Sequence, residues 1–352
     1  MKKKTYLFFI SILILLLIIS LLSNFNLYDK KRFLQSLLIV MSFIGLYGSL
    51  QVTNMFKWLI STIFIIGSLS ALLSTNPAQA FLHLIHIYLS LSLIVLGIYL
   101  KDKINYLFYL LFFSNIFLVS SSLLNYSFFL LDKVPPTADG ILYGFRNIRF
   151  FNQFQIICIP ITLYYLNHKK LSRVATVALT INILLFLVSG ARGALISSMI
   201  MVCFGLHLNL INKKTLIKLI KCSFFASIIF YLYASYHSGI NAYDYTFRIA
   251  SSGRLEMWWD LVSKLTLKNI FIGYGPGSYF ISEMRLSHPH NSILQILYNW
   301  GGVVSFIVMA TLYNLSKKCV ILLKSPAYDS AFNTCLLVTI SLLSYSLFSG
   351  AI

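Results

Sequence analysis

Long apolar runs separated by short polar connections cover almost the whole chain of 352 residues. A helix needs about 20 apolar residues to cross the hydrocarbon core of a bilayer. Lipid satisfies no backbone hydrogen bonds, so segments that cross it singly are helices. The pattern predicts an all-α, polytopic membrane protein in which residues 1–352 form a single integral membrane domain with about eleven transmembrane helices. The expected helices lie near residues 5–22, 33–50, 58–73, 81–100, 104–124, 154–166, 174–189, 194–210, 219–236, 292–312 and 332–348.

Two connections are longer than the others, and both are expected on the outer side of the membrane. The larger, residues 237–291, is an outer loop with a short interfacial helix, within the longest polar stretch of the chain, which runs from Tyr236 to Trp300. The second is residues 125–153. Eleven spans leave the C-terminus outside, so either the last apolar segment is re-entrant or a returning helix completes a set of twelve.

The distribution of basic residues gives the expected orientation. With the N-terminus inside, the inner segments hold sixteen of the 28 Lys and Arg residues, and fifteen of these sixteen are Lys. This fits the positive-inside rule. Arginine instead gathers in the outer segments, where the rule disfavours it, and its planar fork binds phosphate or carboxylate in a bidentate manner. The pattern indicates an anionic ligand at the outer face, near Arg32, Arg146, Arg149, Arg192, Arg248, Arg254 and Arg285.

Composition excludes two broad classes of protein. The chain is 58% hydrophobic and 11% charged, whereas a soluble domain carries roughly 25% charged residues. A net charge of +19 could suggest nucleic acid, but membrane orientation explains the position of the basic residues better. The five cysteines form no CxxC motif and lie in or beside apolar segments, so packing is their expected role.

The segment Ser189-Gly-Ala-Arg192-Gly193 interrupts an apolar stretch that covers residues 174–210. An arginine between two membrane helices costs a few kcal/mol or more unless it is paired or solvated. Glycines beside it allow a tight turn and the close approach of a ligand. Arg192 is therefore a candidate for ligand binding.

A short amphipathic helix is expected near Arg254. Arg254, Met257, Trp258 and Leu261 follow helical spacing, and tryptophan favours the headgroup level. Arg254 would then lie near the plane of the lipid phosphates. It either binds a ligand or extends to lipid headgroups.

The segment Gly273-Tyr-Gly275-Pro-Gly277 predicts a turn with unusual backbone angles. A phosphate cradle is an open alternative, but the spacing supports neither a Rossmann motif nor a P-loop.

His288-Pro-His290-Asn291 precedes an apolar helix. A histidine with a pKa near neutrality can accept a proton from a hydroxyl group. Asn291 either caps the helix or fixes the imidazole tautomer. Two histidines separated by one residue, without nearby cysteines or clustered carboxylates, are poor evidence for a zinc site. We expect no metal and no cofactor.

The segment from Gly144 to Gln155 is rich in hydrogen-bond donors, and Arg146 and Arg149 share one face if it is helical. A ligand-facing edge and a polar seam between packed helices are both open interpretations.

In order and spacing, these motifs resemble the O-antigen ligase and polymerase superfamily. The motifs that carry the resemblance are Ser189-Gly-Ala-Arg192-Gly193, Arg254 with its tryptophans, Gly273-Tyr-Gly275, and His290-Asn291 followed by Leu294, Leu297 and Gly301. The resemblance covers roughly residues 140–350.

The resemblance implies a multi-pass enzyme of the bacterial inner membrane with its site facing the periplasm. It would move an oligosaccharide from undecaprenyl diphosphate to a hydroxyl of a lipid-A core, a glycan or a protein, by an inverting reaction without a metal. Arg192 and Arg254 match the residues that bind the diphosphate, and His290 matches the residue that orients or deprotonates the acceptor. Arg146, Arg149, Arg248 and Asn291 are further candidates for substrate binding.

Three alternatives remain open. A polymerase would use the same chemistry with a lipid-linked glycan as acceptor. A transporter of anions or lipid-linked glycans would favour internal repeats and helices broken at the midplane, and no internal repeat is visible. A non-catalytic subunit of a glycan-assembly complex would keep its function without Arg192, Arg254 and His290.

Overall fold

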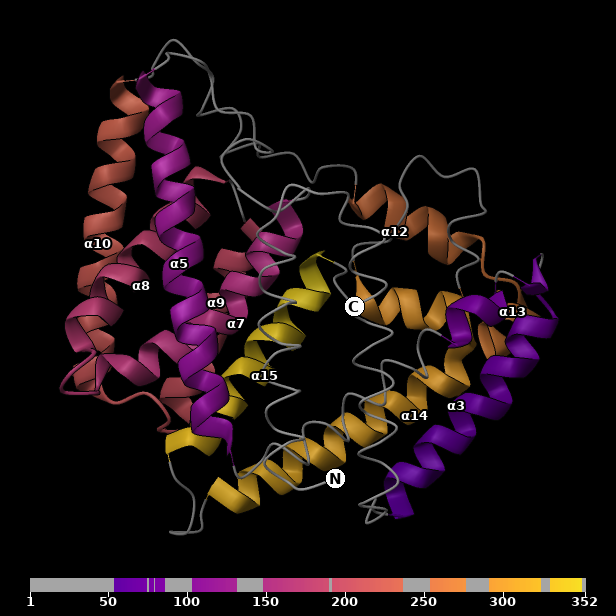
Figure 1. The fold of residues 1–352 in the computed structure, drawn as a ribbon. Coiled ribbons are helices and arrows are strands. Elements are labelled where there is room, and N and C mark those ends of the chain that lie inside the picture. The colour runs from indigo at the N-terminus through magenta and orange to yellow at the C-terminus, as the bar shows by residue number, and fades with distance from the viewer. Residues whose placement is uncertain are drawn as a thin grey trace, which may run out of the picture.

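The computed structural model describes residues 54–74, 76–78, 80–85, 103–131, 148–189, 192–236, 254–276, 291–323 and 330–349. All regular structure in these ranges is helical (Figure 1), as the sequence predicts. The helices are α3 (Asn54–Leu72), α5 (Ile104–Leu131), α7 (Ile148–Leu166), α8 (Ser172–Val188), α9 (Arg192–His207), α10 (Lys213–Tyr236), α12 (Arg254–Ser263), α13 (Leu267–Ile272), α14 (Ser292–Leu323) and α15 (Ser330–Ser349).

Four of the described helices contain segments long and apolar enough to cross a membrane. These segments are Ile104–Leu124, Lys213–Leu232, Ser292–Leu322 and Ser330–Phe348. The helices α8 and α9 are apolar but shorter. The expected spans 5–22 and 33–50 lie outside the described residues, as does most of 81–100, so the total of eleven stays a prediction.

Several helix boundaries differ from those expected. Helix α5 continues to Leu131 rather than 124, and α7 begins at Ile148, so both helices extend into the segment 125–153. Helix α10 begins at Lys213 rather than near 219. Hydropathy alone ends a helix where polar residues begin, but backbone hydrogen bonding continues beyond that point when the polar side chains can reach water. Lys213 and Lys214 are exposed in this way.

Helix α7 forms the centre of the described bundle. Phe151, Ile156 and Leu166 are fully buried, and the helix packs against α5, α8 and α15. At its C-terminal end the ring of Tyr165 lies 4.5 Å from that of Phe112 on α5. Because lipid provides little hydrophobic drive for helices to associate, such close packing holds them together.

A seam of polar side chains crosses this core. The Gln155 amide nitrogen on α7 donates to Asn182 Oδ1 on α8 over 3.0 Å, and both residues are fully buried. Asn182 in turn donates to the Ala178 carbonyl oxygen. Gln155 therefore belongs to a polar seam between packed helices rather than to a ligand-facing edge.

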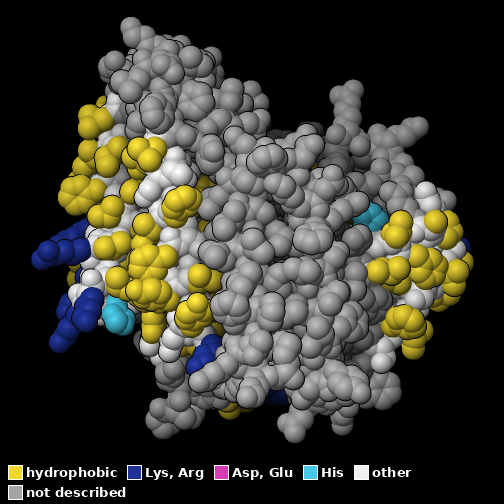
Figure 2. All heavy atoms as spheres, viewed as in Figure 1, with side chains coloured by type: hydrophobic (Ala, Val, Ile, Leu, Met, Phe, Trp, Pro, Cys, Tyr) yellow, Lys and Arg dark blue, Asp and Glu magenta, His cyan; other side chains and the backbone are white. Residues whose placement is uncertain are grey.

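The outer surfaces of several helices are apolar. On α10, Phe224, Phe225 and Leu232 are each about 60% exposed. Figure 2 shows such hydrophobic side chains covering the visible parts of the described helices. Large apolar side chains in contact with the surroundings are expected where helices face lipid.

The connections α7–α8 and α9–α10 meet at one end of the bundle. Lys218 Nζ donates to the Leu166 carbonyl oxygen over 2.6 Å and to Ser172 Oγ over 2.9 Å. The Asn167 amide donates to Thr215 Oγ1 over 2.9 Å. We call this the Lys-rich end, because Lys169, Lys170, Arg173, Lys213 and Lys214 are all exposed around it.

Candidate functional site

The segment between α8 and α9 breaks the apolar stretch where the sequence predicts it. Helix α8 ends at Val188, and the Ser189 amide donates to the Leu185 carbonyl oxygen over 2.9 Å. Helix α9 begins at Arg192, whose side chain is exposed. Arg192 thus lies at the opposite end of α8 from the Lys-rich end.

Helix α15 runs antiparallel to α9. Ser197 Oγ on α9 donates to the Ser341 carbonyl oxygen over 2.5 Å, and Gly205 lies against the side chain of Leu337. Residues nearer the N-terminus of α9 therefore lie beside residues nearer the C-terminus of α15. Arg192 lies five residues before Ser197, so it reaches the C-terminal end of α15.

The start of α14 lies at the same end of α15. Ser292 is 4% exposed, and its Oγ donates to the Ser346 carbonyl oxygen over 3.0 Å. Asn291 Oδ1 accepts hydrogen bonds from the amides of Ile293 and Leu294, at 3.0 and 3.1 Å. Asn291 is therefore the N-cap of α14, one of the roles expected for it from the sequence.

These contacts bring two of the predicted motifs together. Ser341 and Ser346 are five residues apart, which is about 7.5 Å along a helix. Arg192 lies the same distance from Ser197 in the direction of Ser346. The first turns of α9 and α14 therefore meet around one end of α15. In Figure 1, α15 lies between one group of helices that contains α5, α8 and α10 and a second group that contains α3, α12 and α13.

Helix α12 brings Arg254 toward the same place. Leu261 on α12 packs on Tyr298 of α14. In Figure 1, α12 runs in the same direction as the first part of α14, which ends at the non-helical residue Gly301. Leu261 lies seven positions after Arg254, and Tyr298 lies seven positions after Asn291. The N-terminal end of α12 thus lies on the side of Asn291.

The turn at Gly273–Gly275 has the unusual backbone that the sequence predicts, with φ of 82° at Gly273 and 101° at Gly275. Its amides are engaged, because Tyr274 N donates to the Tyr298 carbonyl oxygen over 2.8 Å and Gly275 N to that of Asn299 over 3.0 Å. Two of the amides that would form a phosphate cradle therefore bind α14 instead. The turn serves as a docking element.

A break in α14 makes this docking possible. Gly301 has φ 76° and ψ 179°, which is not helical. Such a break frees carbonyl oxygens in the preceding turn from the helical ladder. The carbonyl oxygens of Tyr298 and Asn299 accept hydrogen bonds from amides of the Gly273–Gly275 turn. The carbonyl oxygen of Asn299 also accepts a hydrogen bond from Ser70 Oγ on α3 over 3.0 Å.

The remaining candidates divide into two groups. Arg149 lies in the first turn of α7. Phe151, two residues later, packs with Leu185 and Val188 at the end of α8, so Arg149 is at the same end of the bundle as Arg192. Arg146, Arg248 and His290 lie outside the described residues, as do the side chains of Arg149 and Arg254.

The sequence-based interpretation missed the serines that assemble this region. Ser197 and Ser292 connect α9 and α14 to α15, and Ser70 connects α3 to α14. The available signal was a serine within an otherwise apolar helix, which is a common way to join membrane helices.

Comparison with known proteins shows which family the chain is similar to. Residues 175–309 match the family model described as O-antigen ligase, and this segment contains all four ordered motifs from Ser189 to Gly301. Searches of curated proteins and of solved structures found no significant match. The family match confirms the resemblance and supports membership of this chain in the O-antigen ligase and polymerase superfamily.

Proposed function

We propose that this protein is a membrane glycosyltransferase that moves an oligosaccharide from undecaprenyl diphosphate to an acceptor hydroxyl at the periplasmic face of the bacterial inner membrane. The observation that carries the proposal is the meeting of the first turns of α9 and α14 at one end of α15. It supports the proposal because Arg192 and Asn291, the sequence neighbour of His290, come from these two turns and lie within the family match.

The diphosphate of the donor would bind at Arg192 and Arg254. Each begins a helix, and the N-terminus of a helix carries a partial positive charge that favours an anion. The guanidinium groups add full charges and a bidentate geometry. Together they would stabilise the charge that develops on the leaving diphosphate, the task that a metal performs in other transferases.

His290 would activate the acceptor. Its imidazole would take the proton of the acceptor hydroxyl while the oxygen attacks the anomeric carbon and the bond from this carbon to the phosphate oxygen breaks. The glycan is then joined to the acceptor, and undecaprenyl diphosphate leaves with the electron pair of the broken bond. Direct displacement of this kind inverts the anomeric centre.

Asn291 would support this step indirectly. Its side chain caps α14 and thereby orients the backbone that leads to His290. Arg146, Arg149 and Arg248 are proposed to contact the donor or acceptor glycan.

A polymerase has the same chemistry and differs in its acceptor, which is a lipid-linked glycan. Deletion of the gene distinguishes them. Single repeat units left on the lipid carrier, without long chains, would show a polymerase, whereas long lipid-linked chains left untransferred would show a ligase. A purified protein that takes up anions in the absence of any glycan donor would contradict both.

A further inference from the structure

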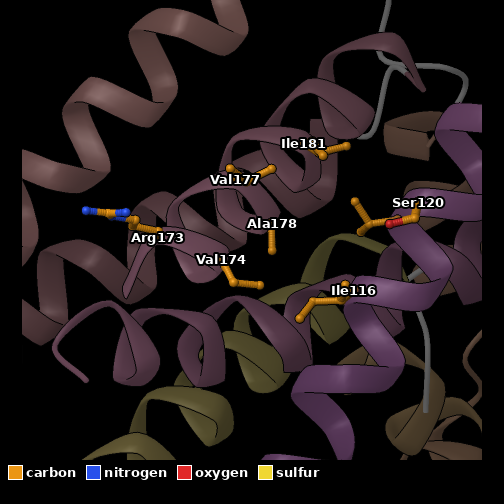
Figure 3. Close-up of a pocket in the computed structure, with 8 residues that line it drawn as sticks. Ile116, Ser120, Arg173, Val174, Val177, Ala178 and Ile181 are labelled. Atoms are coloured by element: carbon orange, nitrogen blue, oxygen red, sulfur yellow. The ribbon is translucent and has the colours of Figure 1, made fainter. Parts of the chain in front are cut away.

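The surface of the bundle is hollowed at a place away from the region around Arg192. A cavity of about 290 Å³ opens on the surface between α5 and α8 (Figure 3). Its walls are almost entirely apolar. They include Ile116, Val119 and Ser120 on α5 and Val174, Val177 and Ala178 on α8.

The cavity opens toward the apolar surroundings of the bundle rather than toward the core. Val174 and Val177 are 42% and 59% exposed, and Phe113 and Phe117 beside it on α5 are 42% and 60% exposed. In a membrane protein such a surface faces acyl chains. A cavity that is apolar and open to lipid fits a hydrocarbon chain.

One end of the cavity is cationic. Arg173 lines it, and Figure 3 shows its guanidinium group extending away from Ile116 and Ser120. Lys169 and Lys170 are exposed in the connection just before α8. Within the described ranges the acidic residues are Glu256 and Asp260, both on α12, so no described carboxylate of α5 or α8 competes for these cations.

The site is separate from the proposed transfer site. Arg173 lies in the first turn of α8, and the break that leads to Arg192 follows the last residue, Val188. At 1.5 Å per residue the two ends of α8 are about 22 Å apart along its axis. The donor bound at Arg192 therefore does not reach this cavity with its diphosphate.

We propose that the cavity between α5 and α8 binds an anionic phospholipid, with an acyl chain against Val174 and Val177 and the phosphate at Arg173. Basic residues beside grooves between membrane helices recognise anionic headgroups, and each Lys or Arg near the surface is worth about 1 kcal/mol. A soluble anion would use the cations but not the apolar walls. A neutral lipid would use the walls but not Arg173.

The test measures lipid binding to the purified full-length protein by native mass spectrometry. Phosphatidylglycerol and phosphatidylcholine with the same acyl chains are compared. Arg173→Gln removes the cation, and Ser120→Leu fills the cavity from an exposed position. Lys317→Gln, on the exposed end of α14, is the matched control for loss of charge.

Wild type should retain phosphatidylglycerol several-fold better than phosphatidylcholine. Arg173→Gln should reduce phosphatidylglycerol binding about five-fold, as expected for the loss of one cation. Ser120→Leu should reduce binding of both lipids, and Lys317→Gln should change neither more than about two-fold. Equal retention of the two lipids by wild type would overturn the proposal, as would variants at Arg173 and Ser120 that bind like Lys317→Gln. Displacement of phosphatidylglycerol by undecaprenyl diphosphate at this site would also overturn it.

Discussion

The hydroxyl of Ser292, in the first turn of α14, donates to the carbonyl oxygen of Ser346, in the last turn of α15, over 3.0 Å. The last four carbonyl groups of a helix have no partner within it. Ser292 therefore satisfies one of these groups and joins the start of α14 to the end of α15. Because Arg192 reaches the same end of α15, this contact connects the two motifs on which the proposed chemistry depends.

Ser292→Ala should weaken glycan transfer more than it weakens folding. The substitution leaves the buried Ser346 carbonyl without its donor, which costs about 1–3 kcal/mol, and it loosens α14 next to His290. Transfer by the purified variant should fall several-fold while its elution profile in detergent stays monodisperse. Ser316→Ala, which removes a hydroxyl bonded within its own helix, is the control. Equal activity of the two variants would contradict this role for Ser292.

Gly301→Ala should destabilise the protein much more than Gly302→Ala. A Cβ at Gly301 would collide with the backbone of Phe271, and its φ of 76° disfavours any L side chain. At Gly302 the nearest atom is the Ile270 carbonyl oxygen, 3.0 Å from the new Cβ, without a positive φ. Backbone strain of this kind costs about 1–3 kcal/mol before the collision is counted. The thermal midpoint of each variant in detergent measures the difference, and equal midpoints would show that the break at Gly301 is not needed.

Asn291→Ala should lower stability by about 1 kcal/mol, the usual cost of losing an N-cap. Asn291→Ser and Asn291→Asp should restore most of it, because their side-chain oxygens also accept from the first free amides of a helix. If transfer recovers together with stability in these variants, Asn291 acts as a cap that positions His290. If Asn291→Asp is stable but inactive, the amide itself contacts substrate and the capping account of its role fails.

Gln155→Leu should reduce stability with little effect on transfer. The change removes the buried hydrogen bond to Asn182, and double-mutant cycles in membrane proteins value such bonds at about 0.6 kcal/mol. A cycle with Asn182→Leu isolates the pair, and the readouts are the thermal midpoint and the transfer rate. A loss of transfer at unchanged stability would return Gln155 to the ligand-facing interpretation.

The sequence predicts the parts of this fold that depend on local patterns. Arg192 between two apolar runs marks the break between α8 and α9, and Asn291 before an apolar run marks the start of α14. Both follow from the nearby residues alone. The same holds for the positive φ angles at Gly273 and Gly275, since closely spaced glycines with a proline predict an unusual turn.

Features that depend on distant partners could not be predicted in this way. Gly301 lies within an apolar run, and its special backbone becomes apparent only when Phe271 lies against it. The phosphate-cradle alternative for Gly273–Gly275 likewise could not be decided from the sequence. The carbonyl oxygens of Tyr298 and Asn299, distant in the sequence, accept the hydrogen bonds of its amides. Helix α15 packs extensively on α7 and α9, but the hydrogen bond that ties it to the start of α14 comes from the single hydroxyl of Ser292, which hydropathy does not register.

The most direct test of the central claim is a transfer assay with purified protein, an undecaprenyl-diphosphate oligosaccharide and a panel of acceptors. Wild type is compared with Arg192→Ala, His290→Ala and the control Lys268→Ala, which removes an exposed cation from α13. The account predicts transfer by wild type and Lys268→Ala. Arg192→Ala and His290→Ala should be folded and inserted but lose at least about 100-fold in rate, as expected when a general base or a charge-stabilising group is removed. Transfer at the wild-type rate by both folded variants would contradict the account.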